Sequence, residues 1–355
     1  MVIVIASGWR GQSVPWLDEK TRDADLIAPN LARFGKQSVV FSRAYCSAVQ
    51  SRSARLDDEI EQPSPWLAGL YPHAFDSSST MLRTMFATAG YRTAAIAHGQ
   101  SDEMIRLVHG KTPFYVEWTL DASSGFVERR DSAGLQLREN VQALDLDRVR
   151  GDMAAFYART KARDKDLGIL LAALDRPGLE DDTIVIFTAD RGQQIGSHGV
   201  NGGISWYEET VRIPLAIRYP AVSNPALRDT LVSQVDLAPT ILSLCGLTMP
   251  PTLPGRDFTA LVSGKAFERS EAIYIEGAVS SQNDWRVLVR GYDKLVSFSD
   301  NREPMLFNLA RDPFEQNNLV QYTADQLTLD SMLALEQTWR RKLGDGVDPS
   351  GLRTR

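Results

Sequence analysis

The chain has 355 residues, of which 43% are hydrophobic and 24% charged, and this composition excludes a disordered or low-complexity protein. Its formal net charge of -6, with no cluster of Lys and Arg, argues against nucleic acid and against an anionic membrane surface as partners. The two cysteines, Cys46 and Cys245, lie far apart in the sequence, which predicts no disulfide framework and favours a reducing, cytoplasmic compartment.

Short β-branched runs alternate with helical patterns over residues 1–264. The first run, Val2–Ile5, is too short to span a bilayer, so we expect a buried strand and no membrane partner. Further strands are expected at residues 38–41, 93–96, 183–188 and 214–218. Helical patterns begin near residues 79, 149 and 236 and end at Gly90, Pro177 and Gly246. This alternation predicts an α/β domain with a mostly parallel central sheet flanked by helices.

The pattern changes after Gly264. Runs at residues 285–290, 295–298 and 305–309 are separated by short turn segments, which predicts a small antiparallel sheet. We therefore expect a second, smaller α+β subdomain at residues 265–355, after an α/β domain at residues 1–264. A final helix is predicted to cover one face of the small sheet with the apolar side chains Leu327, Leu329, Met332, Leu333, Leu335 and Trp339.

Many segments of the chain resemble the sulfatase family (arylsulfatase-like proteins of the alkaline phosphatase superfamily) in both content and order. The resemblance covers nearly the whole chain and implies the sulfatase fold, with a crevice outside the carboxyl ends of the strands. The matching segments are residues 2–12, 28–34, 67–73, 89–94, 186–192, 197–199, 207–209, 212–215, 236–240, 306–309, 312–313 and 317–319.

The resemblance also implies where a sulfatase would bind its divalent cation. Two acidic or amide ligands should follow the first strand, but Ser7 and Gly8 stand there. Two more should follow the strand at residues 183–188, where Asp190 is present and its neighbour is Arg191. A guanidinium beside a metal position repels a cation. We therefore expect that the metal site is lost, with no bound metal and no other cofactor.

The family's nucleophile is a Cys or Ser that is converted to formylglycine, and the resemblance places Gln50 at this position. An amide is not a nucleophile. Cys46 and Ser51 are the nearby side chains that could replace it, and we expect Cys46 to be structural. An alternative is a divergent nucleophile and metal site built from Ser51 and the acidic run Asp57, Asp58 and Glu59, although clustered acids are more often a solvated face.

The cationic side chains that grip sulfate in the family are changed as well. The family's "GKWH" segment after the strand at residues 93–96 reads Ala97-His98-Gly99-Gln100, and Gly203 stands where a second lysine is expected. His98 is read as a polar loop residue or an anion contact, and His198 as a ligand contact. The crevice is predicted to bring together Ser7, Arg52, Arg55, His98, Asp190, Arg191 and His198.

Two functions remain open from the sequence. The first is a sulfatase-like pseudoenzyme, or a repurposed metal-independent protein, that binds a small anionic ligand in the crevice through arginines and histidines. Its candidate substrate-binding residues are Arg52, Arg55, His98 and His198, and the candidate catalytic residues are Asp190, Arg191, His198, His98, Ser51 and Ser7. The second is a divergent sulfuric or phosphoric ester hydrolase. The sequence leaves the ligand and any homo-oligomer undetermined.

Overall fold

The computed structural model describes residues 1–17, 22–23, 26–49, 65–75, 81–97, 100–109, 112–120, 132, 134–142, 145–176, 178–202, 205–268, 270–277, 284–300 and 302–345. Its larger sheet has eight strands. In spatial order, seven of them are β10 (Ala226–Arg228), β2 (Val39–Tyr45), β9 (Arg212–Arg218), β6 (Val185–Thr188), β1 (Val2–Ile5), β5 (Phe114–Thr119) and β4 (Arg92–Ile96), and β11 (Val232–Ser233) pairs with β2.

The larger sheet is mixed but mostly parallel, as predicted. Strand β9 runs antiparallel to both of its neighbours, β2 and β6, while the other described pairs in this sheet are parallel. Every residue of β1 is buried, because a parallel strand covered on both faces requires a continuous apolar run. Strand β1 pairs in parallel with β6, so the carboxyl ends of these two strands lie side by side.

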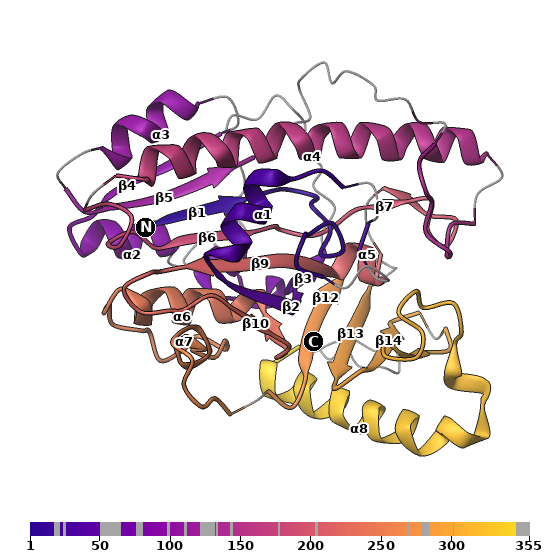
Figure 1. The fold of residues 1–355 in the computed structure, drawn as a ribbon. Coiled ribbons are helices and arrows are strands. Elements are labelled where there is room, and N and C mark those ends of the chain that lie inside the picture. Colours follow the sequence, from indigo (N-terminus) through magenta and orange to yellow (C-terminus); the bar gives the residue numbers. More distant parts are fainter. Residues whose placement is uncertain are drawn as a thin grey trace.

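Helices cover both faces of this sheet (Figure 1). The long helix α4 lies along one face and packs against α1 and α3, whereas α6 and α7 lie on the opposite side. Asp145 begins α4 because its side chain accepts a hydrogen bond from the Arg148 backbone N–H. The helices are α1 (Pro29–Lys36), α2 (Leu82–Thr88), α3 (Ser101–Val108), α4 (Leu146–Leu174), α5 (Glu208–Val211), α6 (Leu237–Leu244) and α7 (Thr259–Val262).

A second sheet is built from five strands. Their order is β15 (Met305–Asn308), β14 (Asp293–Phe298), β13 (Trp285–Arg290), β12 (Ile273–Gly277) and β3 (Ala48–Val49). The pairs from β12 to β15 are antiparallel, as expected from the turns between them, and β3 adds a parallel edge from the N-terminal part of the chain. Strands β7 (Gln194–Ile195) and β8 (Asn201–Gly202) form a separate short hairpin.

The terminal helix α8 (Gln326–Leu343) packs on the second sheet, as predicted (Figure 1). Leu329 and Met332 are buried in a core with Leu288 and Leu295 of the sheet. The prediction for Leu327 was wrong, since its side chain is 84% exposed. Leu327 precedes Leu329 by two positions, which places it about 200° around the helix and away from the sheet.

Strands β5 and β12 were not predicted from the sequence, and both were missed for the same reason. Each carries a glutamate inside an apolar run, which breaks the pattern typical of a buried strand. Both glutamates are buried and have partners. Glu117 accepts a hydrogen bond from the Tyr115 hydroxyl at 2.8 Å, and Glu276 pairs with His73. A buried partner is a long-range property that local patterning does not reveal.

His73 joins three parts of the fold. It lies in the 3₁₀ turn Pro72–Ala74, and its ring nitrogens contact the Glu276 carboxylate of β12 and, at 2.9 Å, the carbonyl oxygen of Leu343 at the end of α8. Burial is the largest single influence and lowers the pKa of His73, but the hydrogen bond and charge of Glu276, with the Leu343 carbonyl and Asp345, together hold the pKa above its usual value. Because both neighbours are acceptors, the charged imidazolium fits this position.

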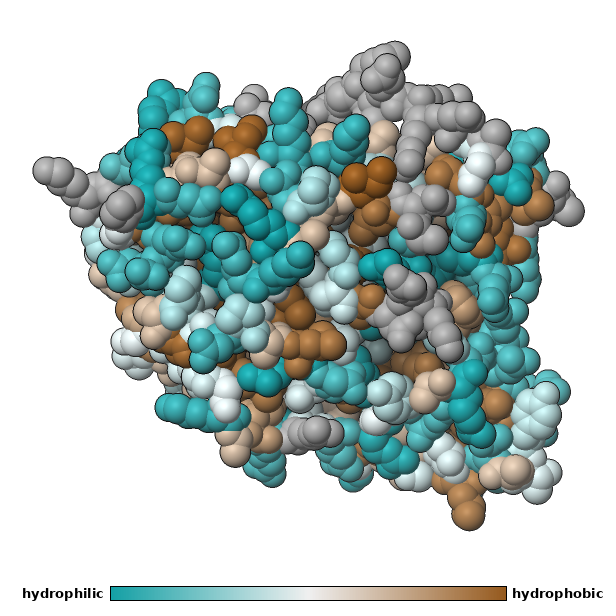
Figure 2. All heavy atoms as spheres, in the orientation of Figure 1, coloured by the Kyte–Doolittle hydropathy of each residue, from teal (hydrophilic) through white to brown (hydrophobic). Residues whose placement is uncertain are grey.

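The surface carries mostly hydrophilic side chains with scattered apolar groups, as Figure 2 shows for one face. Such scattering is normal for globular domains. Among the described helices, none combines the length and the apolar character needed to cross a bilayer.

Candidate functional site

The site begins where strands β1 and β6 end. Ile5 and Thr188 are paired in parallel register, and the Ala6 N–H donates to the Thr188 carbonyl at 2.8 Å. Ser7 and Asp190 each lie two residues beyond this pair, so the register of the sheet brings them together. Ligands bind at this edge in open α/β sheets.

Asp190 accepts hydrogen bonds from the residues around it. The Ser7 hydroxyl donates to Oδ2 at 2.9 Å. The backbone N–H groups of Gly8 and Arg191 donate to Oδ1 at 3.1 and 2.8 Å. Gly8 has a φ of 73°, a conformation that glycine adopts without the cost paid by other residues. The positions where the resemblance implies metal ligands thus present hydrogen-bond donors to the carboxylate.

Arg191 and Cys46 also lie at this edge, close to Asp190. The Arg191 Nη1 donates to the Gly192 carbonyl at 3.2 Å, and its side chain is half-buried. Cys46 is fully buried, and burial followed by the charge of Asp190 raises the pKa of its thiol to about 12. A thiol that stays protonated is a poor nucleophile, which agrees with the expected structural role.

The other residues expected in the crevice lie largely outside the described residues. Ser7, Asp190 and Arg191 are brought together, and His198 makes its contacts with a different set of side chains. The residues outside the described ranges are Gln50, Ser51, Arg52, Arg55, Asp57, Asp58, Glu59, His98 and Gly203.

His198 follows the short strand β7 and packs against Asn140 and against Tyr207, which precedes α5. Its N–H donates to the Asn140 carbonyl at 2.8 Å, and its Nε2 lies 3.0 Å from the Asn140 side-chain Nδ2. Its ring stacks on Tyr207 with a centroid separation of 3.6 Å. Burial is the main cause that lowers the pKa of His198. The imidazole is therefore held mostly neutral near physiological pH.

His198, Glu209 and Glu315 offer ligand atoms that all lie within 4.8 Å of one another. Glu209 accepts from the Asn140 side chain at 2.7 Å. Burial raises the pKa of Glu209, but the charge of Arg138, the hydrogen bond from Asn140 and the charge of Arg10 together outweigh it, so the net shift is downward. The sequence analysis did not single out Glu209 and Glu315 as site residues, although both lie in or beside segments quoted for the resemblance.

Glu315 links this cluster to the second sheet. Its Oε2 accepts from the Glu208 backbone N–H at 2.6 Å, and its Oε1 lies 2.7 Å from the Nζ of Lys294 on β14. Lys294 also lies 3.0 Å from Glu208 Oε1. His198 and Glu315 have φ angles of 54° and 53°, which cost a non-glycine residue roughly 1 kcal/mol or more. The surrounding contacts must supply that energy.

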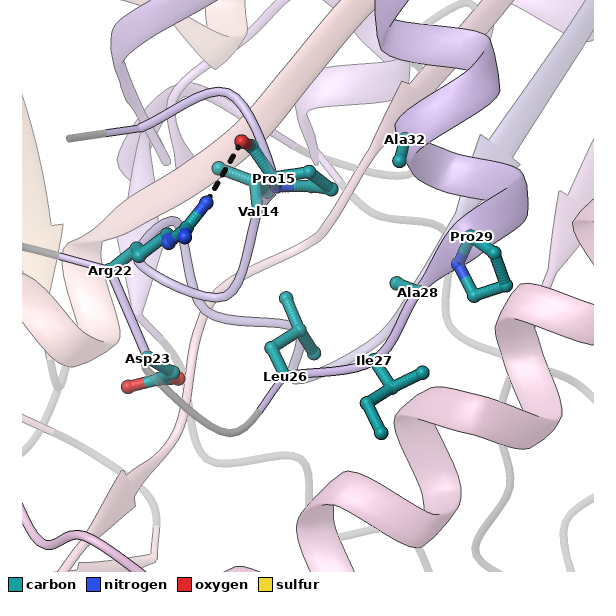
Figure 3. A pocket seen from close by; sticks show the side chains of 9 residues that line it. All are labelled: Val14, Pro15, Arg22, Asp23, Leu26, Ile27, Ala28, Pro29 and Ala32. Atoms are coloured by element: carbon teal, nitrogen blue, oxygen red, sulfur yellow. Dashed lines mark hydrogen bonds between the residues drawn. The ribbon is translucent and has the colours of Figure 1, made fainter. Parts of the chain in front are cut away.

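A shallow pocket of 270 Å³ lies beside the start of α1 (Figure 3). Its lining is apolar apart from Arg22 and Asp23. Arg22 donates to the Pro15 carbonyl at 3.4 Å, and Asp23 pairs with the buried Arg10 at 2.9 Å. Both charged groups are already engaged, so this pocket offers no arrangement for catalysis.

Comparison with known proteins places the chain among sulfatases. The sulfatase family model matches residues 118–247, and the model described as N-sulphoglucosamine sulphohydrolase, C-terminal, matches residues 196–340. A choline-sulfatase of Rhizobium meliloti is 31% identical over 188 residues, covering 52% of this chain and 36% of that protein. The chain spans less than half the length of the curated relatives it matches.

Solved structures agree on the fold. A 2-O GAG sulfatase superposes with a TM-score of 0.81 at 17% identity, covering 97% of this chain and 92% of that one. The phosphonate monoester hydrolase of Agrobacterium radiobacter superposes with a TM-score of 0.77 at 16% identity, covering 96% and 95%. The two family models together match residues 118–340, and a multifunctional alkaline phosphatase superfamily protein of Trinickia caryophylli is 30% identical over 60% of the chain, so the chain belongs to the sulfatase family of the alkaline phosphatase superfamily.

Proposed function

We propose that this protein keeps the sulfatase crevice but uses it without a metal ion and without formylglycine, to bind a small anionic ligand. The hydrogen bonds to Asp190 carry the proposal. Its carboxylate accepts three donors from Ser7, Gly8 and Arg191, at the places where a sulfatase would offer oxygen ligands to a cation. A single carboxylate that is surrounded by hydrogen-bond donors binds a hard divalent cation poorly, since these ions require several converging oxygen ligands.

Arg191 adds an electrostatic cost to cation binding. At contact distance, two like unit charges repel by about 4 kcal/mol at an effective dielectric constant of about 20. The same half-buried guanidinium favours an anion, because its planar donors match carboxylate, phosphate and sulfate oxygens. We propose that Arg52, Arg55 and His98 complete this anion site, as the resemblance implies. Ser7 and Asp190 would orient the ligand.

The alternative, a divergent ester hydrolase, rests on Ser51 and the acidic residues 57–59, which lie outside the described residues. The described part favours ligand binding, because the Cys46 thiol remains protonated and Asp190 is already hydrogen-bonded. Whether the bound ligand undergoes metal-free chemistry is a separate question that turnover measurements answer.

Anion binding is tested by the thermal unfolding midpoint of the full chain in titrations with sodium sulfate, phosphate or acetate, at constant ionic strength. We expect at least one anion to raise the midpoint saturably. Arg191→Ala should remove that rise, because the charge-assisted hydrogen bonds disappear. Arg302→Ala, which removes an exposed arginine paired with Asp300, serves as the matched control and should keep it. Equal midpoints in all salts for the wild-type protein would contradict the proposal.

A further inference from the structure

A second cluster of metal-ligating groups lies where the smaller sheet meets loops of the larger domain. His198 comes from the turn between β7 and β8, Glu209 from α5, and Glu315 from the loop after β15. We propose that these three side chains bind a divalent transition-metal ion, with zinc as the best-fitting ion. This site uses none of the crevice residues Ser7, Asp190 or Arg191, so it stands independently of the proposed function.

The donor set suits zinc. Zinc accepts both imidazole nitrogen and carboxylate oxygen as ligands, and three protein ligands leave its fourth position open. Zinc ligands lie about 2.1 Å from the metal, so neighbouring ligand atoms are roughly 3.4 Å apart. Here the three ligand atoms already lie within 4.8 Å of one another. Zinc binding therefore requires the ligand atoms to approach one another by at most about 1.4 Å.

Buried oxygen atoms without hydrogen-bond partners supply an independent indication of a missing ligand. Within the described part of the chain, Glu209 Oε2 and Asn140 Oδ1 have no hydrogen-bond donor, although both residues are almost fully buried. The Asn140 amide lies between the cluster members, with its Nδ2 at 3.0 Å from His198 Nε2 and 2.7 Å from Glu209 Oε1. A buried polar atom without a hydrogen-bond partner lowers the stability of the fold unless an ion or a water molecule contacts it.

Two cationic side chains among the described residues contact the carboxylates of this region, and Arg138 Nε lies 3.3 Å from Glu209 Oε1, which leaves Oε2 for a metal ion. The single ammonium of Lys294 lies 2.7 Å from Glu315 and 3.0 Å from Glu208, so it is shared between two carboxylates. A carboxylate oxygen carries two lone pairs, and Glu315 Oε1 can contact Lys294 and still coordinate a metal. A bound cation would satisfy Glu209 Oε2 and tie β14 and its following loops to the β7–β8 turn.

Isothermal titration of the chelator-treated full chain with zinc chloride tests the proposal. We expect one equivalent of zinc to bind, and Glu209→Gln and His198→Asn each to weaken the affinity by about 10-fold or more. His109→Asn, which removes a histidine that contacts Ala173 and Arg176 elsewhere, should bind like the wild type. No zinc binding by the wild-type protein overturns the proposal.

Two further results separate this site from the crevice. The Asp190→Asn variant should still bind zinc. If that variant loses zinc while His198→Asn keeps it, the metal lies in the crevice, and this outcome contradicts the proposed function as well as the second site. X-ray absorption of zinc-loaded wild-type protein needs no variant to fold. It should show one imidazole with oxygen ligands, and a sulfur ligand or several imidazoles would overturn the assignment.

Discussion

Lys294→Met is expected to lower the free energy of unfolding by roughly 3 to 5 kcal/mol, the cost of breaking a buried ion pair by removing one partner. The Lys294 side chain is completely buried, with its Nζ between Glu208 and Glu315. Burial alone would lower the pKa of Lys294, but the charge of Glu315, followed by that of Glu208, raises it above its usual value, so the ammonium stays charged. Methionine fills a similar volume but leaves both carboxylates unpaired.

Urea unfolding of the two proteins at neutral pH measures this effect. Lys265→Met is the matched control, because Lys265 is exposed and its replacement should change stability by less than about 0.5 kcal/mol. Adding Glu315→Gln to Lys294→Met should recover part of the loss, since one uncompensated buried charge is then removed. A loss below about 1 kcal/mol for Lys294→Met would show that the buried network does not hold the two sheets together.

Gly192→Ala is expected to destabilise the fold by roughly 3 kcal/mol or more, at the upper end of overpacking effects. A Cβ atom at this position would lie 2.1 Å from the backbone carbonyl oxygen of Glu209 and 3.3 Å from the Arg10 Cα. The backbone cannot simply move away, because the Gly192 N–H donates to the Thr210 carbonyl at 2.8 Å. The segment that carries Asp190 and Arg191 would therefore shift, and anion binding would weaken as well.

Gly151→Ala provides the opposite control for the same chemical change. Gly151 lies inside α4, and an added Cβ meets nothing within 4 Å. Alanine there should stabilise the protein by about 0.5 to 1 kcal/mol, since glycine is a poor helix former. Thermal and urea unfolding of both variants should therefore move in opposite directions. Similar effects in the two variants would contradict the close contact at Gly192.

Much of the fold could be predicted because its main signals are local. Continuous apolar runs such as Val2–Ile5 identify strands buried on both faces, and the strands at residues 285–298 are connected by short turns. Strands β5 and β12 escaped prediction because their buried glutamates depend on partners distant in sequence. Leu327 was misplaced because composition alone does not fix the rotation of a helix at its first turn.

The candidate site was predictable only in part. Ser7 and Asp190 meet because the strands that precede them are adjacent in a parallel sheet, a consequence that follows from the predicted fold. The cluster of His198, Glu209 and Glu315 was not predicted, because it depends on how the second sheet docks on the first. Glu315 is 107 positions from its partner Glu208, and no local pattern encodes that contact.

Hydrolysis of aryl sulfates, phosphate monoesters and phosphodiesters, with and without added divalent cations, tests the metal-free crevice most directly. The comparison should be made between the wild-type protein and Asp190→Ala, with a metal-dependent sulfatase as positive control. Active ester hydrolases accelerate their reactions by about a millionfold or more, so even weak turnover is detectable. We predict no metal-stimulated hydrolysis by either protein. Metal-stimulated hydrolysis by the wild type that disappears in Asp190→Ala would contradict the account and establish a divergent hydrolase.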